Sequence, residues 1–237
     1  MDSRAFAVKP RGVLLRPAVR ITVIWILGEF SLFYNASCNR QRHWILLLQL
    51  FVLVALADEV GISKAVLAQV AIEYGNEARS RVENWGNLMI EVKDGSTQQK
   101  LKQVNDFFND LEFVSDQSQW GVSDYWATPI EFLSTAGGDC EDFSVAKYFT
   151  LRELGIPVEK LRLTYVKAVK LKQAHMVLAY YESPNAVPLV LDNLVGEIKP
   201  ASLRKDLLPV YSFNGDGLWL AKQRGGGRKV SDSSRLS

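Results

Sequence analysis

A cysteine flanked by three acidic residues is the part of the sequence best suited to chemistry. The stretch GGDCEDF, residues 137–143, places Cys140 between Asp139 and the pair Glu141 and Asp142, at the expected first turn of a helix. Unpaired backbone N–H groups and the helix dipole lower the pKa of a thiol there and can hold the oxyanion of an acyl-transfer intermediate. The two glycines let a substrate backbone approach closely. Cys140 is therefore a candidate nucleophile, although a cysteine can also be a small buried apolar residue.

A thiol nucleophile needs a base and a group that orients this base. From residue 58 onward His175 is the only histidine, and it begins a segment of alternating pattern. A hairpin centred between Ser183 and Pro184 would make His175 and Asp192 cross-strand partners, with Cβ atoms about 5 Å apart. We therefore expect His175 to be the general base and Asp192 its orienting carboxylate. Taken singly, each could instead be a hydrogen-bonded polar residue or a cap at the end of a strand.

Two periodicities describe the elements that would position these residues. Apolar residues recur at helical spacing in three segments, 62–89, 101–114 and 139–154. The pattern then alternates in four strand candidates, 161–166, 174–180, 187–191 and 218–220. A loop with Trp120 and Trp126 precedes the cysteine, with a short helical turn at 129–133. Helices followed by antiparallel strands predict an α+β fold.

Composition points to an ordinary globular protein. The chain has 237 residues, of which 48% are hydrophobic and 23% charged, and its formal net charge is +2. We expect one catalytic domain at 58–222 and a disordered basic tail at 223–237. The body has no basic patch interleaved with aromatic residues, so nucleic acid is not expected as a partner. Two cysteines make no disulfide framework.

Residues 1–57 are expected to be a leader. Two arginines precede an apolar run at 44–57 that ends in Ala-Leu-Ala, which is the three-part pattern of a secretory signal. The run is short for a membrane span of roughly twenty residues, although a retained anchor and a buried helix are alternatives. A second apolar run at 21–27 leaves three possibilities: a translation start near residues 35–40, a long leader, or two membrane-associated segments. A signal peptide predicts export to the periplasm.

The motifs GGDCEDF, AHMVLAY and VLDNL, in this order, resemble those of the bacterial transglutaminase-like cysteine proteinases, and in particular the periplasmic LapG type that cleaves large surface adhesins. The resemblance covers about 71–220 and includes VNDFFN at 104–109, YWATPIEFL at 125–133 and YSFNGDGLW at 211–219. It implies a papain-like fold in which Cys140 is the nucleophile, His175 the base and Asp192 the orienting residue.

The resemblance also implies partners. Members of the family cut the N-terminal region of an adhesin near a pair of alanines. This cut releases the adhesin from the outer membrane and implies a role in biofilm dispersal. An inner-membrane receptor that responds to cyclic-di-GMP holds such proteases in check.

A calcium requirement close to the active cysteine is a further implication of the resemblance. Asp139, Glu141 and Asp142, with Asp124 from the tryptophan loop, offer the hard oxygen ligands that calcium prefers. A bound dication would offset the repulsion between these acids and a thiolate. The alternative is that the acids only favour the helix N-terminus.

Two other functions remain compatible with these residues. A transglutaminase or another acyl transferase would use the same Cys-His-Asp triad and pass the acyl group to an amine instead of water. A non-catalytic binding module on a decayed protease fold is the second alternative. The presence of all three triad residue types argues against it.

Overall fold

The computed structural model describes residues 61–220 and 228–232; the expected leader at 1–57, with its apolar run at 44–57, lies outside the described residues. The helices of the described part are α2 (Lys64–Tyr74), α3 (Asn76–Val92), α4 (Thr97–Asn109), α5 (Asp116–Gln119), α6 (Pro129–Thr135), α7 (Cys140–Glu153) and the 3₁₀ turns η1 (Val158–Lys160) and η2 (Ala201–Leu203). The strands are β1 (Glu112–Phe113), β2 (Gly137–Gly138), β3 (Leu161–Ala168), β4 (Gln173–Tyr180), β5 (Leu189–Leu191), β6 (Lys199–Pro200), β7 (Leu207–Asn214), β8 (Gly217–Leu220) and β9 (Arg228–Asp232).

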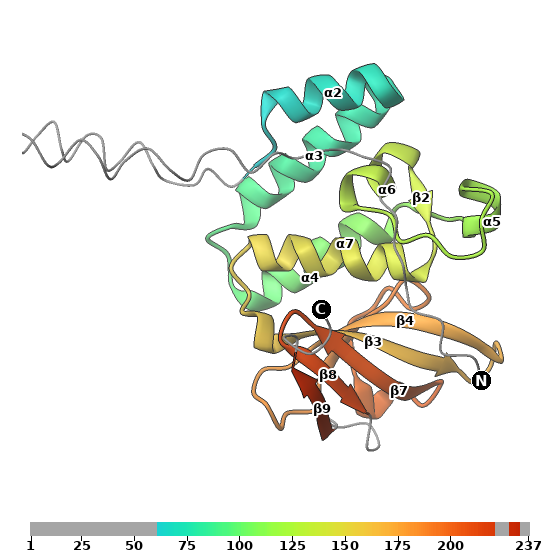
Figure 1. Ribbon diagram of the computed structural model, residues 1–237. Helices are drawn as coiled ribbons and strands as arrows, with labels where there is room; N and C mark the ends of the chain where they lie inside the picture. The colour runs from blue at the N-terminus through green and yellow to red at the C-terminus, as the bar shows by residue number, and fades with distance from the viewer. Residues whose placement is uncertain (1–60, 221–227, 233–237) are drawn as a thin grey trace, which may run out of the picture. The chain divides into compact units, whose positions relative to one another are not determined.

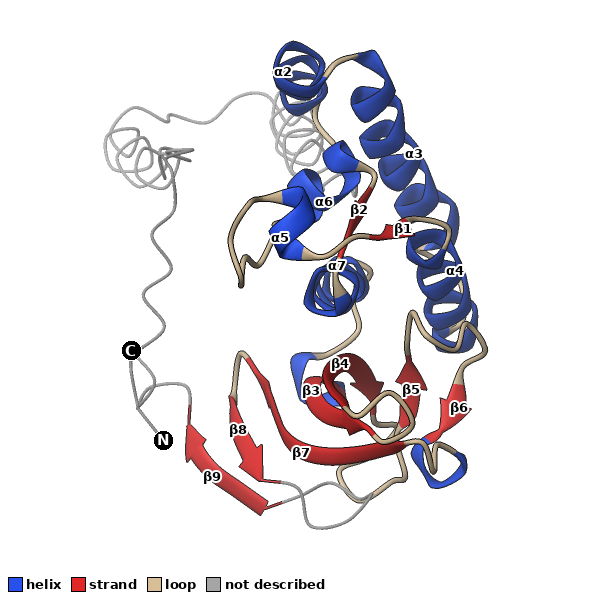
Figure 2. Ribbon diagram, turned by 90° about the vertical axis from the view of Figure 1, so that its right-hand side faces the viewer, coloured by secondary structure: helices blue, strands red, loops and turns tan. Residues whose placement is uncertain are grey.

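The helices and the main sheet form separate layers, with α7 between the other helices and the sheet (Figures 1 and 2). The sheet has the strand order β6-β5-β4-β3-β7-β8-β9, and each neighbouring pair is antiparallel. Helices therefore come first in the chain and cover one face of an antiparallel sheet. The α+β class and papain-like architecture predicted from the sequence are confirmed.

Helix α7 is the centre of the core. Buried residues, both apolar and polar, lie on most of its faces, so the helix is enclosed between two layers. Phe143, Ala146 and Leu151 are buried with Met176 and Leu178 of β4 in one cluster. The core thus fixes the cysteine at the start of α7 against the strand that carries the histidine.

Helix ends follow the sequence locally. Ser63, Ser96 and Thr128 cap α2, α4 and α6 through side-chain oxygens that accept backbone N–H groups of the first turn. Gly75, with φ of 89°, ends α2 and precedes α3, so the segment predicted as one helix at 62–89 is two. None of the helices that the structure describes combines the length and apolar character needed to cross a membrane.

Five of the described strands, β1, β2, β6, β7 and β9, have no counterpart among the strand candidates, and β7 and β9 are the longest of them. Strand β7, Leu207–Asn214, contains Pro209 and lacks a clean alternation, yet it pairs with β3 from Leu163 to Ala168 across a bulge. Arg228–Asp232 lie in the tail that was expected to be disordered, but they form β9 beside β8. The prediction of a disordered tail is therefore wrong for these residues, because they add a strand to the sheet.

Candidate active site

The cysteine lies where the sequence predicts, at the first residue of α7. Asp142 fixes this helix start, because its Oδ2 accepts the backbone N–H of Asp139 at 3.2 Å and its Oδ1 accepts that of Ala127 at 2.7 Å. A Cβ at position 138 would overlap the Asp142 carboxylate and the Phe132 ring, so only glycine fits there. The second glycine of the GGDCEDF motif therefore serves close packing beside Cys140.

A short parallel pair of strands brings the tryptophan loop next to the start of α7. Strand β1 pairs with β2, with Glu112 opposite Gly137, and the N–H of Val114 donates to the carbonyl of Gly138 at 2.8 Å. The pairing holds the two ends of segment 114–136 together just before Cys140. Acidic residues in this segment can therefore lie beside those of the GGDCEDF motif.

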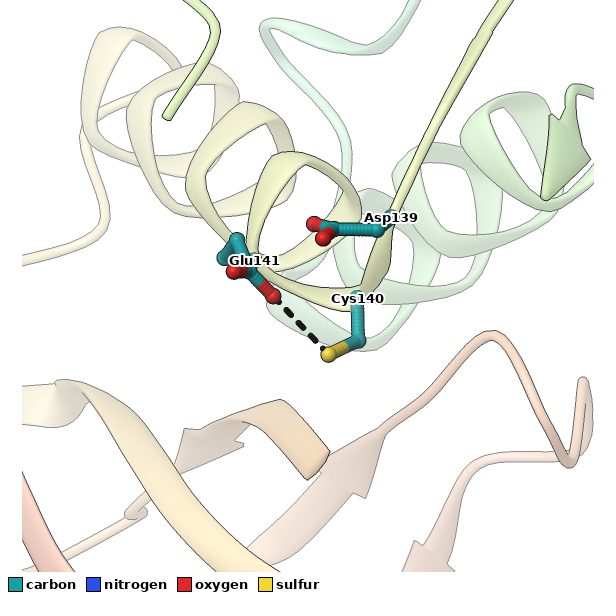
Figure 3. A group of neighbouring side chains, drawn as sticks. All are labelled: Asp139, Cys140 and Glu141. Carbon is teal, nitrogen blue, oxygen red and sulfur yellow. Dashed lines mark hydrogen bonds between the residues drawn. The ribbon is translucent and has the colours of Figure 1, made fainter. Parts of the chain in front are cut away.

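The thiol of Cys140 donates to a carboxylate. Its Sγ lies 3.0 Å from Oε2 of Glu141 (Figure 3). Burial raises the pKa of the Cys140 thiol, and the charge and hydrogen bond of Glu141 raise it further, while a hydrogen bond from the backbone N–H of Met176 acts in the opposite direction. Without a compensating cation the thiol is therefore held in its protonated form.

His175 and Asp192 meet in the interior, as predicted. Nε2 of His175 lies 2.7 Å from Oδ1 of Asp192, and the two side chains are 3% and 0% exposed. Oδ1 also accepts the N–H of Leu194 at 3.0 Å, and Oδ2 accepts a guanidinium N–H of Arg204 at 2.6 Å. Burial alone would raise the pKa of Asp192, but these partners, His175 foremost, lower it below its usual value. Asp192 is thus a buried carboxylate kept ionised.

The route by which these two residues meet differs from the prediction. Strands β4 and β5 pair with Leu178 opposite Leu191, so the register places Asp192 level with Val177 and not with His175. Strand β5 ends before Asp192, and the predicted cross-strand pair is wrong by two residues. Side chains alternate with a period of two, so this shift leaves Asp192 on the predicted side of the sheet. The carboxylate therefore still reaches the imidazole.

Cysteine and histidine come together through the packing of α7 on β4. The sulfur of Cys140 receives the backbone N–H of Met176, which is the residue next to His175. Across residues 61–220, the hydrogen bonds join the thiol to Glu141 and Met176 and the imidazole to Asp192, and none joins the thiol to the imidazole. The structure therefore places the three residues in one region but shows the thiol bonded to an acid.

The acids expected to bind a metal form one cluster with a member that was not predicted. Candidate ligand atoms lie within 4.8 Å of one another in the sets Asp116, Asp124 and Glu141, and Asp116, Asp139 and Asp142. Asp116 is 3% exposed and occurs in both sets. All four predicted ligands thus belong to the cluster, and its two halves are linked both by Asp116 and by a third set, Asp139, Cys140 and Glu141.

The electrostatics of this cluster indicate a place for a cation. Oδ1 of Asp116 and Oδ1 of Asp139 are buried without a hydrogen-bond partner. Burial, together with the neighbouring acids, raises the pKa of Asp139 to about 9 and that of Asp142 to about 7, and burial also raises the pKa of Asp116. Buried carboxylate oxygens without donors are costly unless they bind a cation. The donor set consists of hard oxygens and therefore fits calcium better than a thiophilic metal.

Arg204 and Asp116 are the residues that reasoning from the sequence missed. Arg204 is 3% exposed and bridges Asp192 and Asp206, with guanidinium-to-carboxylate distances of 2.6 and 2.8 Å. Nothing in the local sequence connects it to Asp192. Asp116 had a weak signal, because it follows Ser115 in the same loop as Asp124.

Comparison with known proteins agrees with this geometry. The family model for bacterial transglutaminase-like cysteine proteinases matches residues 72–205. Among solved structures, calcium-bound LapG of Legionella pneumophila is 46% identical, with a TM-score of 0.62 over 69% of this chain and 91% of that one. EGTA-treated LapG of the same organism is 44% identical, with a TM-score of 0.64 over 74% of this chain and 93% of that one. The comparison with curated proteins found no match.

The family match covers more than half of the chain and includes Cys140, His175 and Asp192. The similarity to LapG extends over nearly the whole of that structure. By its sequence, its fold and the residues gathered at the start of α7, the chain belongs to the family of bacterial transglutaminase-like cysteine proteinases.

Proposed function

We propose that the protein is a calcium-dependent periplasmic cysteine endopeptidase that cleaves the N-terminal region of a large surface adhesin. Cleavage releases the adhesin from the cell surface and promotes biofilm dispersal. The observation that carries the proposal is the buried pair His175–Asp192, with 2.7 Å between Nε2 and Oδ1. His175 of this pair is on β4, the strand against which the Cys140 helix packs. Similarity to LapG of 44–46% identity supports the protease class, and the adhesin substrate follows from the resemblance of the motifs to the LapG type.

In the proposed mechanism Cys140, His175 and Asp192 act as a triad. Nε2 of His175 is engaged by Asp192, so Nδ1 is the nitrogen that takes the thiol proton. The thiolate attacks the scissile carbonyl, and the backbone N–H of Cys140 at the start of α7 stabilises the oxyanion. The imidazolium protonates the leaving amine, and His175 then activates the water that hydrolyses the thioester. Asp192 keeps the imidazole in the productive tautomer throughout.

Calcium is the proposed cofactor of the acidic cluster. Asp116, Asp124, Asp139, Glu141 and Asp142 are the residues that would hold it. When bound, the ion supplies positive charge next to Cys140 and so favours the thiolate. The unpartnered buried oxygens of Asp116 and Asp139 support this assignment, as do the calcium-bound and EGTA-treated forms of the related LapG.

The proposed partners are the adhesin and an inner-membrane receptor. The receptor responds to cyclic-di-GMP and sequesters the protease until the adhesin is to be released. Export by an N-terminal signal would place the protease in the same compartment as both partners. Deleting the receptor in cells that produce the protease should increase adhesin loss from the surface, and an unchanged level of surface adhesin would count against this partner.

A cleavage assay tests the enzymatic proposal. The full chain is incubated with the N-terminal fragment of the host's largest repeat adhesin, in calcium, in chelator, and in chelator followed by excess calcium. We expect two fragments with calcium, none with chelator, and recovery when calcium is restored. The Cys140→Ala variant should not cut, and its melting temperature should be nearly that of the wild type because Cys140 is only partly buried. A stable Cys140→Ala protein that still cuts would remove Cys140 from the mechanism.

The same assay separates hydrolysis from acyl transfer. A glutamine peptide and a labelled amine are added in a parallel reaction. Label incorporation without fragments would favour a transglutaminase activity, whereas fragments without incorporation favour the protease. If neither occurs and a thiol reagent fails to label Cys140, a binding module becomes the better interpretation.

A further inference from the structure

A buried lysine lies seven residues after the nucleophile, on the same helix. Lys147 is 1% exposed, and its ammonium donates to Oδ1 of Asn105 at 3.0 Å and to Oδ1 of Asn109 at 2.6 Å. Both asparagines belong to α4, which packs against α7. The nucleophile helix is therefore joined to α4 by a charge-assisted polar contact in the core.

The two asparagines pass this connection on to the loop that carries Asp192. Nδ2 of Asn109 donates to the backbone carbonyl of Asp192 at 2.9 Å, and Nδ2 of Asn105 donates to the carbonyl of Gly196 at 2.7 Å. An ammonium can only donate and a backbone carbonyl can only accept, so the orientation of each amide is fixed by its two partners. Lys147 therefore determines which end of each amide faces the loop.

From this arrangement we propose that Lys147, Asn105 and Asn109 are positioning residues. They hold the backbone of loop 192–196 so that the Asp192 carboxylate meets His175. The inference rests on the proposed triad. It adds residues that touch neither substrate nor metal, because their contacts are with the backbone of the loop and with each other.

The restraints on Asp192 divide into two groups. Arg204, Leu194 and His175 hold its carboxylate oxygens, whereas Asn109 holds its main-chain carbonyl. The side-chain partners do not fix the backbone of Asp192, because Asp192 begins a loop directly after Leu191, the last paired residue of β5. The Asn109 contact therefore fixes the point from which the carboxylate extends.

The cost of this network argues for a role beyond filling the core. Burial lowers the pKa of Lys147 to about 7, only partly offset by the charges of Asp192 and Asp106. An apolar side chain of similar volume is often as stabilising as a buried charge, or more so. A lysine held here at such cost is explained by the directional contacts that it imposes on the two amides.

Variants of Asn109 test the proposal in the full chain. Asn109→Ala removes the donor to the Asp192 carbonyl, and Asn109→Asp keeps the volume and the acceptor for Lys147 but also removes this donor. We expect kcat for adhesin-fragment cleavage to fall roughly 10- to 100-fold in both variants with KM little changed, because a small misplacement of catalytic groups has an effect of this size. Lys147→Met should lower kcat in the same direction.

Thr150→Val is the matched control. Thr150 is on α7, is fully buried, accepts the indole N–H of Trp85 at 2.9 Å and donates to the carbonyl of Ala146 in its own helix, so these side-chain hydrogen bonds do not involve loop 192–196. It should lower the melting temperature as the Asn109 variants do while kcat stays at the wild-type level. All assays are run well below the lowest melting temperature of the set.

A second readout does not depend on the substrate. The rate at which iodoacetamide alkylates Cys140, followed by mass spectrometry of its peptide in calcium, reports on the thiolate that His175 sustains. It should fall in the Asn109 and Lys147 variants and not in Thr150→Val. Wild-type kcat and alkylation rate in folded Asn109→Ala and Asn109→Asp proteins would overturn the inference. Absence of cleavage by the wild type would instead count against the proposed function.

Discussion

In this structure the thiol of Cys140 donates to the carboxylate of Glu141 at 3.0 Å, while His175 is bonded to Asp192. The thiol proposed as nucleophile is therefore hydrogen-bonded to an acid, and the imidazole proposed as its base is hydrogen-bonded to another. Burial and Glu141 together raise the pKa of the thiol, so this arrangement describes an inactive protonation state. Conversion to a reactive thiolate requires that the negative charge of Glu141 be neutralised or its hydrogen bond to the thiol be broken, because both raise the pKa of the thiol.

Replacing Glu141 with glutamine should make the cysteine more reactive when no metal is present. The change removes a negative charge next to Sγ and so lowers the thiol pKa toward its ordinary value. In chelator at neutral pH, we expect Glu141→Gln to be alkylated by iodoacetamide faster than the wild type. Glu153→Gln, at the exposed end of the same helix, should leave the rate unchanged. Equal rates for Glu141→Gln and wild type would show that Glu141 does not control the thiol.

Calcium should raise the melting temperature, and Asp116 should be needed for this effect. A ligand that binds only the folded state at 100 times its Kd stabilises by about 2.7 kcal/mol. Asp116→Asn should reduce the calcium-induced shift strongly, yet in chelator it should melt at or above the wild-type temperature because it relieves repulsion in the cluster. Asp110→Asn, an exposed change, should behave as the wild type. A full calcium shift in Asp116→Asn would exclude this residue as a ligand.

Replacing Arg204 with lysine should impair catalysis more than folding. The guanidinium bridges Asp192 and Asp206, and a lysine ammonium lacks the planar fork that does this. We expect kcat to fall by roughly tenfold, as for other residues that orient a catalytic group through hydrogen bonds. Asp206→Asn keeps the contact between Arg204 and Asp192 and should have the smaller effect. A larger loss of kcat in Asp206→Asn than in Arg204→Lys would contradict the view that Arg204 orients Asp192.

The stability contributed by Asp192 should disappear in acid. Its folded-state pKa is lowered below the ordinary value of 3.8, so the unfolded chain binds the proton more readily than the native protein. The free energy of unfolding therefore rises with pH through this range, and the contribution is lost as pH falls from about 5 through the folded-state pKa. Urea unfolding of wild type and Asp192→Asn should show a stability gap at pH 6 that narrows toward pH 3. A gap that is constant with pH would mean that Asp192 is not ionised in the native state.

The sequence sufficed to predict the local arrangement at the start of α7, because its signals are local. The glycine pair, the acids around Cys140 and the helix that follows occupy one continuous stretch. The layer order was also predictable from helical and alternating periodicities. These features depend on neighbours in the chain and not on distant contacts.

The features that were predicted wrongly or missed depend on contacts between residues far apart in the sequence. The register of β4 and β5 depends on the conformation of the connection at 181–188, which a centred-hairpin assumption does not capture. Arg204 reaches Asp192 only because η2 is folded back against the sheet, and its role has no local signature. The contact between His175 and Asp192 was predicted through a wrong register, because a shift of two residues preserves the side of a strand.

The β1–β2 pair closes segment 114–136 into a loop whose two ends meet just before α7. Its ends are joined where the N–H of Val114 donates to the carbonyl of Gly138, and its middle is tied to α7 where the N–H of Ala127 donates to Asp142. This loop carries Asp116 and Asp124, whereas Asp139, Glu141 and Asp142 lie with Cys140 at the start of α7. The candidate ligands therefore come from two pieces of the chain, so a bound cation would staple this loop to the helix that carries Cys140 and make the order of the loop depend on the metal.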